Sequence, residues 1–181
     1  MAGGSDWREY AFYFLGYAVL GWMLESFYNR YSAGTFLKEN FLKGPYKPMY
    51  GFAPAVLVAA GGTSLSWYLF ALLTLMVPSA VEYASGVWLN RCFGRGWWHY
   101  GNHRFQWGGH ICLRFSMYWW ALSAAVLLWL QPFMSSLYAG GAPLWNTLVP
   151  MVLVLLAADF AWTWRVRRRP AAEFGGDLQK G

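Results

Sequence analysis

The chain has 181 residues, of which 57% are hydrophobic, 21% are aromatic and only 12% are charged, with a formal net charge of +6. Soluble domains carry roughly 25% charged residues, and disordered chains combine much charge with few aromatic residues. The composition therefore excludes disorder and leaves too little charge to cover a soluble monomer. It predicts an all-α protein, a polytopic membrane helix bundle.

Five apolar stretches suit membrane crossings, each of which takes about 20 residues of helix. We predict spans at about residues 10–28, 49–62, 65–89, 111–130 and 145–164. The second stretch is too short for a full crossing, so we expect it to be short or partly re-entrant. One transmembrane domain over residues 1–169 and a disordered tail over 170–181 follow from this assignment.

Lysine and arginine are distributed unevenly between the predicted loops. They occur after the first and third spans and in the tail, at Arg30, Lys38, Lys43, Lys47, Arg91, Arg95, Arg104, Arg165, Arg167, Arg168, Arg169 and Lys180. Segments 61–64 and 131–144, predicted on the opposite side, contain none. Because basic residues collect in cytoplasmic loops, we expect the N-terminus outside and the C-terminus in the cytoplasm. A four-span alternative, with 49–77 as one crossing, would split the basic segments between the two sides.

Since topology accounts for the basic residues, we expect membrane lipids as surroundings and no nucleic-acid partner.

Four predicted spans carry an ionisable residue: Glu25, Glu82, Arg114 and Asp159. Each costs about 2.5–3.5 kcal/mol at a helix centre, so each is expected to be paired or to face a cavity. Counted along the helices at about 1.5 Å per residue, all four fall near the cytoplasmic interface.

Three interpretations of these four residues stay open. In the first, Arg114 pairs with carboxylates and locks the bundle. In the second, the four residues line a polar cavity that opens to the cytoplasm and serves cation binding, proton coupling or acid–base catalysis. In the third, the side chains reach the interface separately and share no site.

The loop of residues 40–52 contains several aromatic residues and the dipeptides Gly44–Pro45 and Lys47–Pro48, whose prolines stop a helix. Its Tyr46 and Tyr50 are expected either to line a substrate path or to anchor a helix at the interface.

The loop of residues 91–114 combines Arg95 with Trp98 and Tyr100. Aromatic faces with arginine suit a lipid headgroup, a phosphate or a stacked ring, and the alternative is an interfacial aromatic belt. His99 and two further histidines lie in the same loop, but its glycines argue against the continuous helix that would align metal ligands. No metal and no cofactor are expected.

Four stretches together resemble a bacterial membrane family labelled putative ABC-transporter type IV, or putative ABC-transporter permease. They are a Gly-Trp-x-x-Glu end to the first span (Gly21, Trp22, Glu25), an F-L-x-G-P-x-x-P-x-Y-G loop (Phe41–Gly51), a Glu-Tyr pair (Glu82, Tyr83) and a W-W-x-Y stretch with a following F-x-x-x-G-x-I-C-L (Trp97–Leu113). The likeness covers about residues 10–125. This chain has His99, Gln106 and His110 where the family has Asp, Asn and Arg.

The resemblance and the ionisable residues lead to one main hypothesis, a transport or permease-like protein of the bacterial inner membrane. Its ligand site would comprise Glu25, Glu82, Arg114, Asp159, Tyr46, Tyr50, Trp98, Tyr100 and Arg95. Because the chain has no phosphate-binding glycine loop, we do not expect it to be an ATPase subunit itself. Because 181 residues are few for a complete transporter, we expect an ATPase subunit as partner, or assembly with itself. One alternative is an intramembrane enzyme acting on a lipid or polyprenyl headgroup, with Glu82 or His99 as acid–base group. A second alternative is an accessory or scaffold subunit without its own chemistry.

Overall fold

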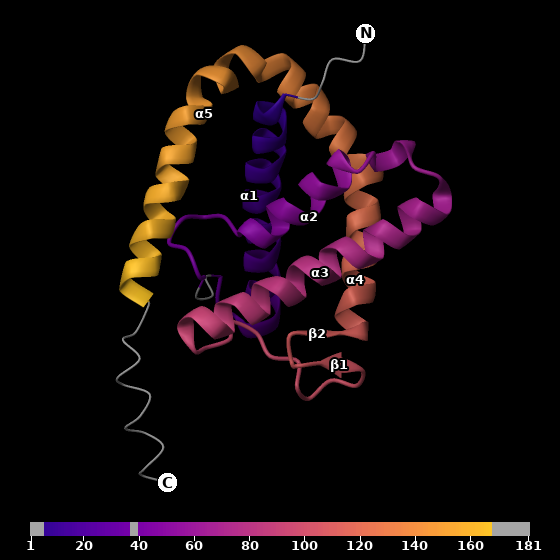
Figure 1. The fold of residues 1–181 in the computed structure, drawn as a ribbon, viewed down its shortest axis with the longest axis vertical. Helices are drawn as coiled ribbons and strands as arrows, with labels where there is room; N and C mark the ends of the chain where they lie inside the picture. The colour runs from indigo at the N-terminus through magenta and orange to yellow at the C-terminus, as the bar shows by residue number, and fades with distance from the viewer. Residues whose placement is uncertain (1–5, 37–39, 168–181) are drawn as a thin grey trace.

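A computed structural model of the chain describes residues 6–36 and 40–167. The elements in chain order are α1 (Trp7–Ala33), α2 (Pro48–Ala59), a 3-10 turn (Gly62–Ser64), α3 (Trp67–Phe93), strands β1 (Gln106–Trp107) and β2 (Ile111–Cys112), α4 (Leu113–Ala125), a π-helical turn (Val126–Leu130) and α5 (Gln131–Arg167), as Figure 1 shows. The protein is therefore mostly helical, as predicted. The predicted tail, residues 170–181, and the basic residues Lys38, Arg168, Arg169 and Lys180 lie outside the described residues.

The last third of the chain differs from the sequence prediction, which placed a connecting segment at 131–144. Residues 113–167 instead form one continuous helical segment of 55 residues. Figure 1 shows that α5 arches over the top of the molecule and descends on the other side of α1. Pro143 and Pro150 lie inside α5, and proline is a common cause of helix bending.

Contacts with α1 hold the arch in place. Met134 is buried against Tyr13 and Tyr17 of α1, and the indole N–H of Trp145 donates to the backbone carbonyl of Arg8 at 2.7 Å. These contacts stabilise α5 on both sides of the adjacent Gly140 and Gly141, where the chain continues as helix.

Two helical segments are long and apolar enough to cross a membrane, Trp67–Phe93 and Leu113–Arg167. The second exposes large apolar side chains along α5, including Leu144 and Val154, each 67% exposed. An apolar surface of this extent suits contact with lipid. Helix α2 has only 12 residues, about 18 Å at the usual rise, which agrees with the prediction of a short second stretch. The number of crossings and their orientation stay predictions.

Close packing between α1 and α2 depends on glycine. A Cβ atom at Gly51 of α2 would lie 2.3 Å from the backbone oxygen of Phe14, and one at Gly21 of α1 would lie 2.3 Å from the Cβ atom of Tyr50. Phe14, Gly21 and Glu25 share one face of α1, because they are spaced by about two turns or one. Small residues at helix contacts let two backbones approach closely, and here they bring Tyr50 beside Glu25.

We expect Gly51→Ala to lower the free energy of unfolding by about 1–3 kcal/mol, because the added methyl group meets backbone that cannot move aside cheaply. Gly140→Ala is the matched control, since a Cβ atom there meets nothing within 4 Å. This control should be neutral or stabilising by up to about 1 kcal/mol. Thermal unfolding in detergent measures both, and equal effects of the two substitutions would contradict the packing described.

Candidate functional site

A cavity of about 930 Å³ lies among the helices and the two loops 40–47 and 94–112. Its volume falls within the range of about 300–1,000 Å³ typical of small-molecule sites. Most of its lining is aromatic or aliphatic, and its charged lining residues are Glu25, Lys47 and Glu82. An apolar cavity with a few polar groups is the usual form of a binding site for a small organic molecule.

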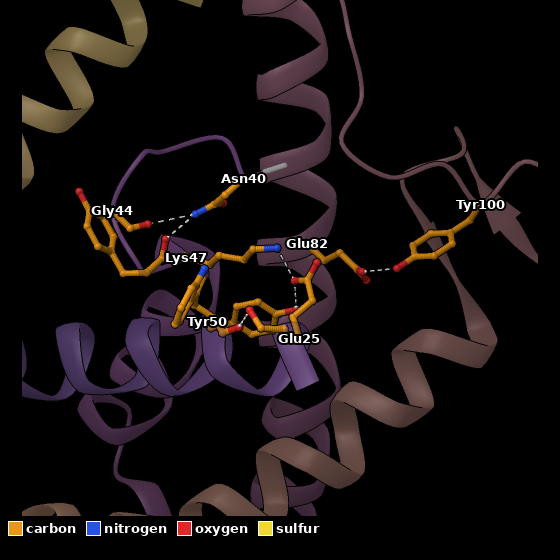
Figure 2. Close-up of polar contacts among 10 residues, drawn as sticks. Glu25, Asn40, Gly44, Lys47, Tyr50, Glu82 and Tyr100 are labelled. Carbon is orange, nitrogen blue, oxygen red and sulfur yellow. Dashed lines mark hydrogen bonds and ion pairs between the residues drawn. The ribbon is translucent and has the colours of Figure 1, made fainter. Parts of the chain in front are cut away.

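Glu25 is held by two partners from the start of α2. The Lys47 ammonium pairs with its Oε2 at 2.5 Å, and the Tyr50 hydroxyl donates to the same oxygen at 3.0 Å. Figure 2 shows both side chains reaching Glu25. The Lys47 backbone N–H donates to the carbonyl of Ala18, two turns before Glu25 on α1. This anchor places the lysine over the same face of α1 as the glutamate.

Glu82 is the most deeply buried ionisable residue of the cavity, with 2% of its surface exposed. It lies on the inward face of α3, in the series Thr74, Pro78, Glu82 and Gly86, spaced by four residues, all of which are buried. The Tyr100 hydroxyl donates to its Oε1 at 2.9 Å, as Figure 2 shows. Its Oε2 is buried without a hydrogen-bond partner among the described residues.

The short hairpin β1–β2 positions the aromatic residues around Glu82. Gly108 and Gly109, with φ of 59° and 72°, form its turn, a conformation that glycine adopts without steric cost. The backbone carbonyl of Gly109 accepts from Tyr100 N–H at 2.8 Å. The next carbonyl, that of His110, accepts from the Trp98 indole at 3.0 Å. The hairpin thus fixes two cavity-lining aromatic residues from the loop before it.

Within the part of the chain that the structure describes, three buried side-chain polar atoms lack a hydrogen-bond partner: Glu82 Oε2, Trp97 Nε1 and Trp119 Nε1. All three residues line the cavity. The Trp119 indole lies close enough to Glu82 to act on its carboxyl group, but its N–H forms no hydrogen bond with a described residue. Unpaired buried polar groups are rare in native proteins, and their concentration around one cavity makes this cavity the candidate functional site.

Two loop tyrosines keep their protons at neutral pH. Burial and the neighbouring Glu82 raise the pKa of Tyr100 far above its usual value of about 10. Burial and the hydrogen bond to Asp159 raise the pKa of Tyr46 in the same way. Both hydroxyls therefore act as hydrogen-bond donors to carboxylates.

Asp159 of α5 lies outside the cavity lining and binds loop 40–47. Its carboxylate accepts from the backbone N–H of Gly44 at 2.9 Å and of Lys43 at 3.2 Å, and from the Tyr46 hydroxyl at 2.6 Å. Arg167, two turns later, donates to the carbonyl of Asn40 at 2.9 Å. These bonds fasten loop 40–47, which lines the cavity, to the C-terminal half of α5.

The interpretation in which Arg114 pairs with buried carboxylates is wrong. Arg114 is exposed near the start of α4, and its Nε donates to the Tyr118 hydroxyl at 3.1 Å. It makes no ion pair with any described residue. It is the second residue of α4, in the first turn of the helix, and its side chain lies on the surface. The cation that pairs with an acid of the cavity is Lys47, whose partner is the partly buried Glu25.

The structure brings together six of the predicted site residues and separates four. Glu25, Glu82, Tyr46, Tyr50, Trp98 and Tyr100 line the cavity, whereas Arg114, Asp159, Arg95 and His99 do not. Arg95 lies over the Trp97 ring at 4.8 Å, and His99 lies against Gly101 and Gly109. Lys47 and Trp119 were missed as site residues. The position of Lys47, directly before the proline that starts α2, was the available signal, whereas nothing in the sequence distinguished Trp119 from the other tryptophans.

The comparison with known proteins gives one family. The family described as Putative ABC-transporter type IV matches residues 12–164, a longer stretch than the motifs at 10–125 cover. No curated protein and no solved structure matches the chain.

We expect Lys47→Met to lower the free energy of unfolding by about 1–3 kcal/mol, because it leaves the Glu25 carboxylate without its cation. Adding Glu25→Gln to Lys47→Met should restore part of the loss, since no unpaired charge then remains. Arg114→Leu, the control, should leave the midpoint of thermal unfolding unchanged. A larger loss from Arg114→Leu than from Lys47→Met would show that the ion pair is misassigned.

Proposed function

Because the chain belongs to the putative ABC-transporter type IV family, we propose that its cavity is the substrate-binding site of a permease-like membrane protein. Family membership and the two apolar helical segments point to a transport-related membrane role. The cavity adds a place where a transported molecule could bind, next to carboxylates and aromatic rings.

One observation carries the proposal. Glu82 is almost fully buried, lines the cavity and has one carboxylate oxygen that no described residue satisfies. A carboxylate used only to hold helices together would have both oxygens paired, as those of Asp159 are, because an unpaired buried acceptor costs about 1–3 kcal/mol. The unpaired oxygen is therefore better explained by a ligand than by a purely structural role.

The proposed location is the bacterial inner membrane, with five crossings, a cytoplasmic C-terminus and the cavity open to the cytoplasm. Figure 1 places the β-hairpin and the C-terminal end of α5 at the bottom of the molecule, and the N-terminal end of α1 and the arch of α5 at the top. Arg104 lies just before the hairpin, and Arg165 and Arg167 lie in the last turn of α5. Clustering of these basic residues at one end supports the orientation.

The proposed partners are an ATPase subunit, which the family label suggests, or a second copy of the chain. Either would cover part of the exposed apolar surface of α5, and membrane lipids would cover the rest. Co-purification in mild detergent with the product of a neighbouring ATPase gene tests the ATPase partner. If the protein purifies as a monomer without an ATPase, both proposed partners are contradicted.

Glu82→Gln should reduce accumulation of the transported compound at least about tenfold, because the amide keeps the size of the side chain but removes its charge. The test incubates membrane vesicles with host-cell extract and compares their contents by mass spectrometry. Glu9→Gln, which alters a carboxylate of α1 outside the cavity lining, is the control and should accumulate the same compound as the unaltered protein.

Equal accumulation by the Glu82→Gln and unaltered proteins at matched membrane levels would contradict the proposal. So would the absence of any compound that depends on the protein.

A further inference from the structure

We propose that the ligand of this cavity is an amphipathic organic cation, an ammonium group on an apolar or aromatic body. The inference rests on the proposed function, since it names the chemical class of the molecule bound at the same site. The ammonium group would donate to Glu82 Oε2, and the aromatic lining would hold the apolar body.

Charge balance is the first argument. The charged residues of the lining are Glu25, Lys47 and Glu82, and Lys47 forms an ion pair with Glu25. Glu82 makes no ion pair with any described residue, so the lining has an excess of one carboxylate. A buried charge is expensive unless it is paired and hydrogen-bonded. A ligand cation would supply the missing partner, whereas an anion would add to the imbalance.

The geometry of the carboxyl group is the second argument. Tyr100 occupies Oε1 from the hairpin side, and the backbone of the hairpin holds Tyr100 in turn. Glu82 is thereby oriented before any ligand arrives, with Oε2 left to accept a hydrogen bond. An ammonium N–H is a suitable donor, because hydrogen bonds between two charged groups are roughly twice as strong as neutral ones.

The aromatic walls are the third argument. Tyr50 and Trp119 meet edge to face with centroids 5.5 Å apart, and Tyr100 stacks on Phe115 at 4.7 Å. All four rings line the cavity. Aromatic faces attract cations by about 0.5–2 kcal/mol each, most strongly away from water. Arginines could have favoured an anion instead, but Arg95 and Arg114 lie outside the lining.

Three probes that differ only in the polar end test the inference: phenylbutylammonium, phenylbutanol and phenylbutyrate. Binding is measured by calorimetry with the full chain in lipid nanodiscs, and nanodiscs without protein are the blank. The cation should bind at least about tenfold more tightly than the alcohol, a factor worth about 1.4 kcal/mol, and the carboxylate should bind most weakly. Glu82→Gln should abolish the preference for the cation and leave the alcohol affinity unchanged, whereas Glu9→Gln should retain the preference.

A second variant provides an independent test if Glu82→Gln does not fold. Ala157→Lys places a positive charge in the lining at an exposed position of α5, and it should also lower the affinity for the cation about tenfold. Equal affinity for cation and alcohol, or tightest binding of phenylbutyrate, would overturn the inference while leaving the cavity as a ligand site. The proposed function fails separately, if accumulation in vesicles does not depend on Glu82.

Discussion

The constraint on which the rest of the structure depends is the burial of the Glu82 carboxyl group inside an apolar cavity, where the described residues hydrogen-bond only one of its two oxygens. The inward face of α3 places it there, and the hairpin β1–β2 holds Tyr100, which donates a hydrogen bond to it. Helices α1 and α2 pack closely through Gly21 and Gly51, and Phe14, Tyr50 and Phe52 of these helices line the cavity. Both loops are therefore part of the wall around one acidic group.

The other two acidic residues of the spans have different roles, and this contrast makes Glu82 distinctive. Asp159 is saturated by backbone N–H groups and Tyr46, and it fastens a loop to α5. Glu25 is neutralised by Lys47 and held by Tyr50. Each has partners that account for its place in a low-dielectric environment. Of the three, only Glu82 has a buried carboxylate oxygen without a hydrogen-bond partner among the described residues.

The helical class and the grouping of Glu25, Glu82, Tyr50 and Tyr100 around one cavity could be predicted from the sequence, because charged residues in apolar stretches and aromatic loops are visible without coordinates. The pairing of charges could not. Arg114 is the one cation inside a predicted span, which suggested it as a partner for the acids, but the contact of α1 with loop 40–47 brings Lys47 to Glu25 instead. Helix across 131–144 was missed because burial of Met134 against α1 outweighs the local signal of Gly and Pro.

The most direct test of the central claim, an open chamber beside Glu82, is chemical access to the cavity wall. Ser85→Cys, in a chain with Cys92→Ala and Cys112→Ala, places a thiol in the lining, and Leu57→Cys places one at a buried position outside it. A membrane-impermeant quaternary ammonium thiol reagent should label the first, and not the second, in vesicles whose cytoplasmic face is outward. Absence of labelling at position 85 from that face, with labelling restored after denaturation, would show that the chamber is closed to the cytoplasm and would contradict the account.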